Sequence, residues 1–400
     1  MNVFVAILGL GLLVFVHEAG HFFTARAVGM SPRRFYIGFP PAIVKFKRQG
    51  IEYGLGAIPL GGYVKIPGMH RPAPSDLDTF FGPARDEAPE LHGPIEHVKR
   101  KLDVGDMEGA RTQLQTLEEA LDSVEISRVA RGGAAKGLNE LRDGLGGDAY
   151  WRQRTWKKVS VIFAGPGTNL LFAIVLFAAL FVIGSGGYRL GFSMETDTPV
   201  VHDVRSDHPA AKIGLQPGDR IVAINGQPVQ TVSDVPTLIE ESKGGPVTLT
   251  IRRDGGTMRL GPARPKREER LSPPRAAWES VRLTGVITKE IGASLSRLVQ
   301  GNRKEVSSPV GIVEGSSEAL NHGVQTYLWV LGLLSLSLAL LNLLPLLPLD
   351  GGHIVFSIVE GIRGRAVGRE VYERVSAVGI ALVLLLFFIG LSNDIGNLGG

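Results

Sequence analysis

Four long apolar segments constrain what this chain can fold into more than any other feature of its sequence. Residues 161–183 and 327–349 each contain 23 positions without a charged side chain, and residues 375–392 contain 18. A helix of about 20 apolar residues crosses a bilayer core, and lipid offers no hydrogen-bond partner to an open backbone. We therefore expect a polytopic α-helical membrane protein with four transmembrane helices.

The first apolar segment, residues 3–16, is the shortest of the four. Its length also suits the apolar region of a signal peptide, and the Ala-Arg-Ala tripeptide at 25–27 offers a nominal cleavage site. However, no basic residue precedes the segment, and three ionisable residues at 17–21 interrupt it before that site. We favour a retained helix that runs to about Val28.

Basic residues beside the spans predict the orientation of the chain, because Lys and Arg accumulate on the cytoplasmic side. The flanks between the first two spans hold ten such residues, those between the second and third hold only Arg189, and the loop between the third and fourth holds four. We therefore expect a multi-pass protein of the inner (plasma) membrane. Loops one and three are predicted to lie in the cytoplasm, and loop two and both termini outside it. The net charge of +4 is a weak indication of nucleic-acid binding, and we expect no such partner.

Loop two contains a compact, β-rich segment at about 198–262. Short apolar runs alternate there with turn signals, at 199–204, 220–225 and 247–252. Two short helical stretches fit between them, at 208–214 and 232–241. The string at 207–221, followed by Ile224-Asn225-Gly226, resembles the PDZ domains of bacterial envelope proteases, which bind extended peptide at a sheet edge. A small spacer domain with ordinary hairpin turns is the alternative.

Loop one carries a long polar stretch at 70–150. We expect one helical stretch in it, around 95–121, because leucines at 114, 117 and 121 share one helix face. The stretch is interpreted as a solvated helical insertion, and no chemistry is assigned to it. After loop two, a linker rich in Pro and Arg precedes a predicted amphipathic helix at 276–300.

The segment His17-Glu18-Ala19-Gly20-His21 is an H-E-x-x-H motif. On a helix, residues i and i+4 share a face, so both imidazoles can bind one metal ion, and Glu18 can take a proton from the attacking water. Ionisable groups in a membrane span cost about 2.5–3.5 kcal/mol each on insertion scales, so three within five residues indicate a function. A buried polar network that stabilises helix contacts is the structural alternative.

A catalytic zinc ion usually takes three protein ligands and leaves one position for water. The chain has no cysteine, which excludes thiolate ligands, disulfides and thiol catalysis. His17 lies past the middle of a span that starts outside, and the third span ends at a similar depth, at Asp350. Two prolines before Asp350 should break the helix there. We favour Asp350 as the third ligand, and His353 is the competing candidate.

Taken together, these motifs resemble the site-2 protease family of intramembrane zinc metalloproteases, in its bacterial form with a single PDZ domain. The resemblance covers most of the chain outside 70–150. It rests on the H-E-x-x-H motif, on the strings at 342–345 and 349–353, and on supporting strings at 57–65, 163–169 and 308–312.

The resemblance implies zinc-dependent hydrolysis of peptide bonds within transmembrane segments. The substrates would be single-span membrane proteins trimmed beforehand by another protease, such as anti-sigma factors or remnant signal peptides. The resemblance assigns Glu18 as the catalytic base and three residues as zinc ligands, namely His17, His21 and Asp350. It also implies that Asn342 and Asn169 line the substrate path, with hydrogen bonding between helices as the alternative.

The stretch Ile51–Pro67 resembles the membrane-dipping β-hairpin of that family, in which Gly61 and Gly62 would leave backbone free to hold a substrate extended. The PDZ domain would act outside the membrane, as a size filter or as a sensor of the substrate's trimmed end. A non-proteolytic membrane PDZ scaffold with a structural metal site is the main alternative, although such a site needs no base. A metal transporter would require more polar residues in spans two and four than the sequence has.

The predicted organisation divides the chain into nine parts. They are the first span with the H-E-x-x-H motif (1–29), the membrane-associated β-loop (30–69), the cytoplasmic helical insertion (70–156), the second span (157–186), the PDZ domain (187–262), the linker and amphipathic helix (263–325), the third span with the Asp ligand (326–350), a cytoplasmic loop (351–371), and the fourth span with the C-terminus (372–400).

Overall fold

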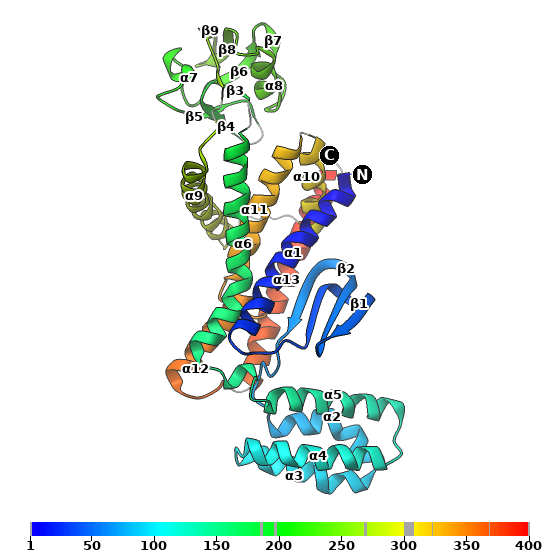
Figure 1. Ribbon diagram of the computed structural model, residues 1–400. Helices are drawn as coiled ribbons and strands as arrows, with labels where there is room; N and C mark the ends of the chain where they lie inside the picture. The colour runs from blue at the N-terminus through cyan, green and yellow to red at the C-terminus, as the bar shows by residue number, and fades with distance from the viewer. Residues whose placement is uncertain are drawn as a thin grey trace. The chain divides into compact units, whose positions relative to one another are not determined.

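The computed structural model describes residues 2–184, 187–195, 198–267, 270–299, 308–321, 323–367 and 369–398. The chain divides into two compact units (Figure 1). Unit 1 contains residues 1–174 and 284–400, and unit 2 contains residues 175–283. All the residues predicted for the metal site and the substrate path belong to unit 1.

Four helices of the described chain are long and apolar enough to cross a membrane, and each covers all or most of one of the four apolar segments of the sequence. They are α1 (Asn2–Ala27), α6 (Thr155–Ile183), α11 (Val324–Asn342) and α13 (Arg369–Leu398), in which the apolar stretch is Val371–Asp394. Two shorter helices accompany them, α10 (Pro309–Asn321) and α12 (Asp350–Arg363).

The third apolar segment does not stay helical to its end. Helix α11 ends at Asn342, and residues 343–349 connect it to α12. Pro345 and Pro348 lie in this connection, and proline cannot donate the backbone hydrogen bond that a helix interior requires. The break predicted from the two prolines is therefore present, and it makes Asp350 the first residue of a new helix.

A long antiparallel hairpin follows α1 and consists of β1 (Arg34–Arg48) and β2 (Ile51–Lys65). Each strand bends back, so that residues 34–37 of β1 pair with 62–65 of β2 on one side and with 52–55 on the other. Residues 44–48 of β1 complete the sheet beside 51–55. The hairpin is thus a small sheet in which residues 62–65 form an edge.

The polar stretch after the hairpin folds into a helical insertion with its own core, drawn separately from the long helices in Figure 1. It contains α2 (Pro74–Glu87), a short 3-10 helix (Pro89–Leu91), α3 (His92–Asp103), α4 (Met107–Ser123) and α5 (Arg128–Leu145), and a second 3-10 helix (Tyr150–Arg152) follows it. The expectation of one helical stretch around 95–121 is wrong. Gly105 has a φ of +76°, which ends α3, and the Asp106 carboxylate accepts a hydrogen bond from Gly109 N at 2.8 Å, which starts α4.

Unit 2 is rich in short strands, as the alternating turn signals predict. They are β3 (Tyr188–Arg189), β4 (Phe192–Met194), β5 (Val201–Val204), β6 (Arg220–Ile224), β7 (Gln227–Pro228), β8 (Val247–Arg253), β9 (Gly256–Ala263) and β10 (Lys266–Arg267), with helices α7 (Pro209–Lys212) and α8 (Asp234–Glu241). The largest sheet has the order β7-β6-β8-β9. Asp254 and Gly255 both have a positive φ between β8 and β9, as a two-residue hairpin turn requires. Helix α9 (Pro273–Val299) follows the strands.

Candidate metal centre

The two histidines of the H-E-x-x-H motif lie one turn apart on α1, and both are buried. Their burial depends on a close approach of α1 to α6, which two glycines permit. A Cβ atom on Gly20 would lie 2.4 Å from the Ala164 carbonyl oxygen, and one on Gly165 would lie 2.3 Å from Nε2 of His21. Any larger residue at either position would separate the helices. The close packing against His21 thus explains why a glycine stands at position 165 in the string at 163–169.

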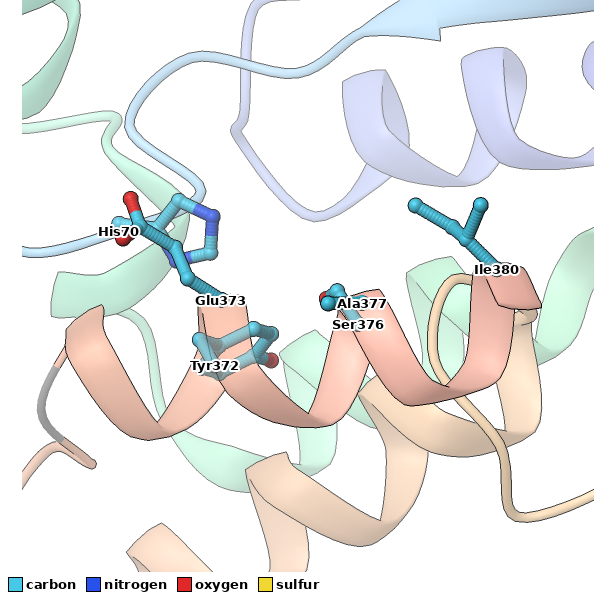
Figure 2. A pocket seen from close by; sticks show the side chains of 6 residues that line it. All are labelled: His70, Tyr372, Glu373, Ser376, Ala377 and Ile380. Carbon is cyan, nitrogen blue, oxygen red and sulfur yellow. The ribbon is translucent and has the colours of Figure 1, made fainter. Parts of the chain in front are cut away.

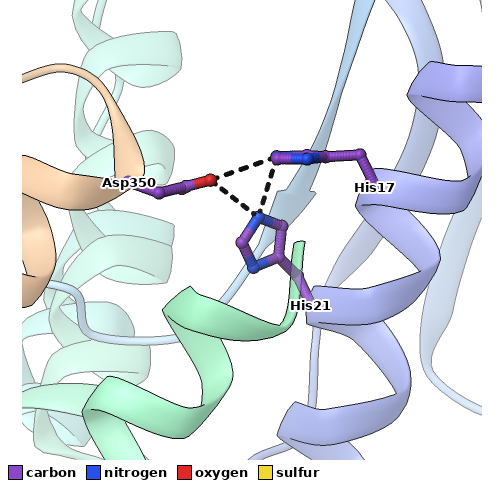
Figure 3. Close-up of side chains that lie close together, drawn as sticks. All are labelled: His17, His21 and Asp350. Carbon is purple, nitrogen blue, oxygen red and sulfur yellow. Dashed lines mark hydrogen bonds and ion pairs between the residues drawn. The ribbon is translucent and has the colours of Figure 1, made fainter. Parts of the chain in front are cut away.

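Asp350 completes the group from the far end of the chain (Figure 3). Its Oδ2 atom lies 3.1 Å from Nε2 of His17 and 3.4 Å from Nε2 of His21, and the two Nε2 atoms are 3.2 Å apart. Gly351 and Gly352 allow this placement, because a Cβ atom on either would lie within 2.5 Å of the backbone between α11 and α12. The helix break and the glycine pair together bring the carboxylate to the histidines.

The three atoms fit a bound cation. Oδ2 of Asp350 is buried and has no hydrogen-bond donor in the part of the chain that the structure describes. Nδ1 of His21 lies 2.8 Å from the Val161 carbonyl oxygen, so in the neutral ring the proton belongs on Nδ1 and Nε2 carries a lone pair. Tetrahedral zinc with bonds of about 2.0–2.1 Å to nitrogen and oxygen sets its ligand atoms about 3.3 Å apart, close to the observed 3.1, 3.2 and 3.4 Å.

Asn169 lies against the other histidine. It is fully buried on α6, and its amide lies 3.4 Å from Nδ1 of His17. The amide oxygen of Asn169 has no donor among the described residues. Exchanging the amide oxygen and nitrogen by a half-turn of the side-chain amide would let Nδ1 of His17 donate to that oxygen and leave Nε2 free for a metal. Asn169 therefore stands beside the metal group.

Glu18 lies on α1 between the histidines and is buried against the β1–β2 hairpin. A Cβ atom on Gly62 would lie 2.9 Å from Cγ of Glu18, and the Val64 backbone faces the Glu18 carboxyl group. Arg33 N donates to the Lys65 carbonyl oxygen at 2.8 Å, so the main-chain groups of Val64 point to the opposite, open side of the strand. The edge at 62–65 thus faces Glu18.

His353, the competing ligand, points elsewhere. Its Nδ1 atom lies 3.4 Å from the hydroxyl of Tyr372, and burial lowers the pKa of its imidazole to about 4. Tyr372 borders a cavity of about 280 Å³ together with His70 and Ser376 (Figure 2). The side chains whose ligand atoms converge are those of Asp350 and the two histidines.

The two other residues predicted for the substrate path, Asn342 and Gly61, form no hydrogen bond or ion pair with the metal-ligand candidates among the described residues. Asn342 is the last residue of α11 and is half-buried, and Gly61 lies in β2 beside Gly62. Sequence reasoning missed Val161 as a partner of the site, because it contributes only a backbone carbonyl, which any residue provides.

A motif of two histidines and a glutamate on an apolar helix, with a carboxylate brought to it from another segment, defines a membrane metalloprotease. A family model for peptidase family M50 matches residues 5–386. The chain therefore belongs to peptidase family M50, the site-2 protease family, and is a zinc metalloprotease with several candidate membrane helices.

Its relatives agree with this assignment. A zinc metalloprotease named RasP from Bacillus licheniformis is 29% identical, and the match covers 100% of both chains. The regulator of sigma-W protease RasP from Bacillus subtilis is 28% identical over 97% of this chain and 96% of its own. A relative from Agrobacterium fabrum, also named as a zinc metalloprotease, is 31% identical over 98% of this chain and 95% of its own.

Proposed function

We propose that the protein is an intramembrane endopeptidase that hydrolyses peptide bonds within the transmembrane segments of single-span membrane proteins. The observation that carries the proposal is the position of the site. Two of the three metal-ligand candidates and Glu18 lie within α1, a helix long and apolar enough to cross a membrane, and Asp350 starts the helix after α11. A protease of soluble substrates has no need for such a location, since ionisable groups inside a span are costly.

In this proposal His17, His21 and Asp350 hold the zinc ion, and Glu18 is the general base. Bound zinc supplies a Lewis acid that lowers the pKa of water and polarises the scissile carbonyl. Glu18 takes a proton from the attacking water while the water oxygen bonds to the carbonyl carbon of the substrate. When the C–N bond breaks, the proton passes to the leaving nitrogen, so the products are a carboxylate and an amine.

A helical substrate hides its peptide bonds, so it must be extended before attack. The edge at 62–65 of β2 lies beside Glu18 and pairs with 34–37 on one side only, so a substrate segment can add on its other side as a further strand. Gly62 has no side chain to obstruct that approach. These features support Gly61 and Gly62 as backbone contacts of the substrate.

The experiment uses the purified protein in liposomes with a single-span model substrate tagged at both ends. We expect mass spectrometry to locate the cut inside the apolar segment and cleavage to require zinc. Cuts confined to the polar flanks of the substrate would contradict an intramembrane activity. Stoichiometric zinc with no turnover on any membrane segment would favour the alternative, a PDZ scaffold with a structural metal site.

We further propose an inner-membrane location with the metal site near the cytoplasmic face and with unit 2 and both termini outside. Fourteen basic residues lie beside the spans in the two predicted cytoplasmic loops, and only one lies beside the spans in loop two, which supports this orientation. Membrane-anchored regulators such as anti-sigma factors, and remnant signal peptides, are the proposed substrates, and the name of the Bacillus subtilis relative as a regulator of sigma-W supports the former. Cysteines placed singly in each loop and labelled with a membrane-impermeant reagent would test the orientation.

Unit 2 is proposed to be a PDZ domain that binds extended extracytoplasmic peptide. Its four-stranded sheet with two short helices, and the resemblance of residues 207–226, support this assignment. Deleting residues 198–262 should leave peptide hydrolysis intact and change which of several competing substrates is cut. Unchanged relative rates for these substrates after the deletion would count against a role in selection.

A further inference from the structure

A second cluster of charged residues joins the helical insertion to the β1–β2 hairpin. Its centre is Asp143, a buried residue near the end of α5 that is 7% exposed. One carboxylate oxygen of Asp143 accepts a hydrogen bond from Nε of Arg33 at 2.8 Å, and the other lies 3.1 Å from Nζ of Lys65. No step of the proposed reaction uses these residues.

Arg33 and Lys65 are the two ends of the hairpin. Arg33 directly precedes β1, Lys65 is the last residue of β2, and Arg33 N donates to the Lys65 carbonyl oxygen at 2.8 Å. Asp148 adds a bond to Nη1 of Arg33 at 3.0 Å, and Glu140 adds one to Nζ of Lys65 at 2.8 Å. Burial alone would lower the pKa of Lys65, but its bonds to Glu140 and Asp143 outweigh that effect and raise the pKa above its ordinary value. Lys65 is therefore charged at neutral pH.

The same strand leads directly to the base. The backbone of Val64, next to Lys65, faces the Glu18 carboxyl group, and a Cβ atom on Gly62 would lie 2.9 Å from Cγ of Glu18. A shift of Lys65 must move Val64, because one peptide unit separates them. The position of the hairpin beside Glu18 therefore depends on the ion pairs that hold Arg33 and Lys65 at its ends.

We infer that Asp143 is a positioning residue that holds both ends of the hairpin and thereby keeps the 62–65 edge against Glu18. The inference rests on the proposed role of Glu18. It gives the helical insertion a function in the reaction, as the anchor of the strand that orients the base and receives the substrate. Misplacing reacting groups by about 1 Å can cost on the order of 100-fold in rate.

The test compares Asp143→Asn with Asp78→Asn. Asp78 lies in the same insertion and pairs with Lys99 at 2.9 Å and with Arg85 at 3.4 Å, away from the hairpin, so its variant controls for the loss of an aspartate that pairs with two basic side chains. We expect Asp143→Asn to keep its zinc, to lower kcat about tenfold or more, and to speed amide hydrogen exchange in residues 51–65. Asp78→Asn should match the wild-type protein in kcat and in exchange of residues 51–65.

A double-variant cycle with Lys65→Met separates positioning from a general structural role. If Asp143 acts through Lys65, the effect of Asp143→Asn on kcat should be smaller in the Lys65→Met background than alone. Additive effects, or hairpin exchange equal to that of Asp78→Asn, would overturn the inference. If Asp143→Asn unfolds the insertion, the Lys65→Met variant serves as the test instead. Amide hydrogen exchange of residues 51–65 at the wild-type rate in that variant would also overturn the inference. The exchange measurement needs no turnover, so it tests the inference even if the wild-type protein fails to cut a membrane segment.

Discussion

Replacing Glu18 with glutamine should lower the rate of peptide hydrolysis by about two to four orders of magnitude and leave bound zinc unchanged. Glutamine keeps the size and the hydrogen-bonding oxygen of the side chain but cannot take a proton from water. The metal-ligand candidates His17, His21 and Asp350 are untouched by the change. The measurements are the cleavage rate on a single-span substrate and the zinc content of the same preparation.

A matched control is Glu314→Gln on α10, which removes an exposed carboxylate from a helix that packs on α1. It should cleave at the wild-type rate. Cleavage that survives both Glu18→Gln and removal of zinc by a chelator would refute the assignment of the base. Loss of zinc from Glu18→Gln would instead indicate that Glu18 supports the metal ligands.

Asp350→Ala should weaken zinc binding by more than about 100-fold, because loss of a second-shell partner alone typically costs 10- to 100-fold. The carboxylate supplies one of three converging ligand atoms and the only negative charge among them. Asp350→Asn, which keeps an oxygen but loses the charge, should bind zinc more weakly than the wild-type protein and more tightly than Asp350→Ala. Competition with a chromophoric chelator would measure these affinities without reference to activity.

His353→Ala is the matched control for the third ligand. His353 lies three residues after Asp350 and points to Tyr372, so its loss should leave zinc affinity within a few-fold of wild type. Persistent zinc binding in Asp350→Ala together with its loss in His353→Ala would reverse the ligand assignment.

Asn169→Ala should have a graded effect, lowering zinc affinity about 10- to 100-fold, because Asn169 is positioned to orient His17 without itself reaching the metal. Ser335→Ala is its control. The Ser335 hydroxyl donates to the backbone oxygen of Asn169 at 2.8 Å and does not touch the amide that faces His17. If both variants bind zinc like the wild-type protein, Asn169 has no such role.

Patterns that repeat over neighbouring residues were predictable. The four candidate membrane helices follow from uninterrupted apolar segments, and the i, i+4 spacing places both imidazoles on one face of α1. The turn at Asp254-Gly255 follows from residues that tolerate a positive φ. Asp350 could be chosen because a membrane imposes a depth on every residue of a span, so two spans can be compared without knowing their packing.

The single helix expected around 95–121 shows where such reasoning stops. The prediction rested on leucines at 114, 117 and 121, which all lie in α4, and one glycine with positive φ followed by a capping aspartate separates this helix from α3. The periodicity of one helix face carries no information on where the helix begins.

By itself, the sequence determined the candidate membrane helices, the chemistry of the site and the identities of its ligand candidates, because these depend on residue type and local spacing. Only the tertiary structure decided that the Val161 carbonyl faces His21, that the edge at 62–65 lies against Glu18, and that Asp143 joins the hairpin to the insertion. Arg33 and Asp143 are 110 residues apart, and Val161 acts through its backbone. Contacts of this kind arise when distant segments pack together, and they leave no periodicity or spacing along the chain.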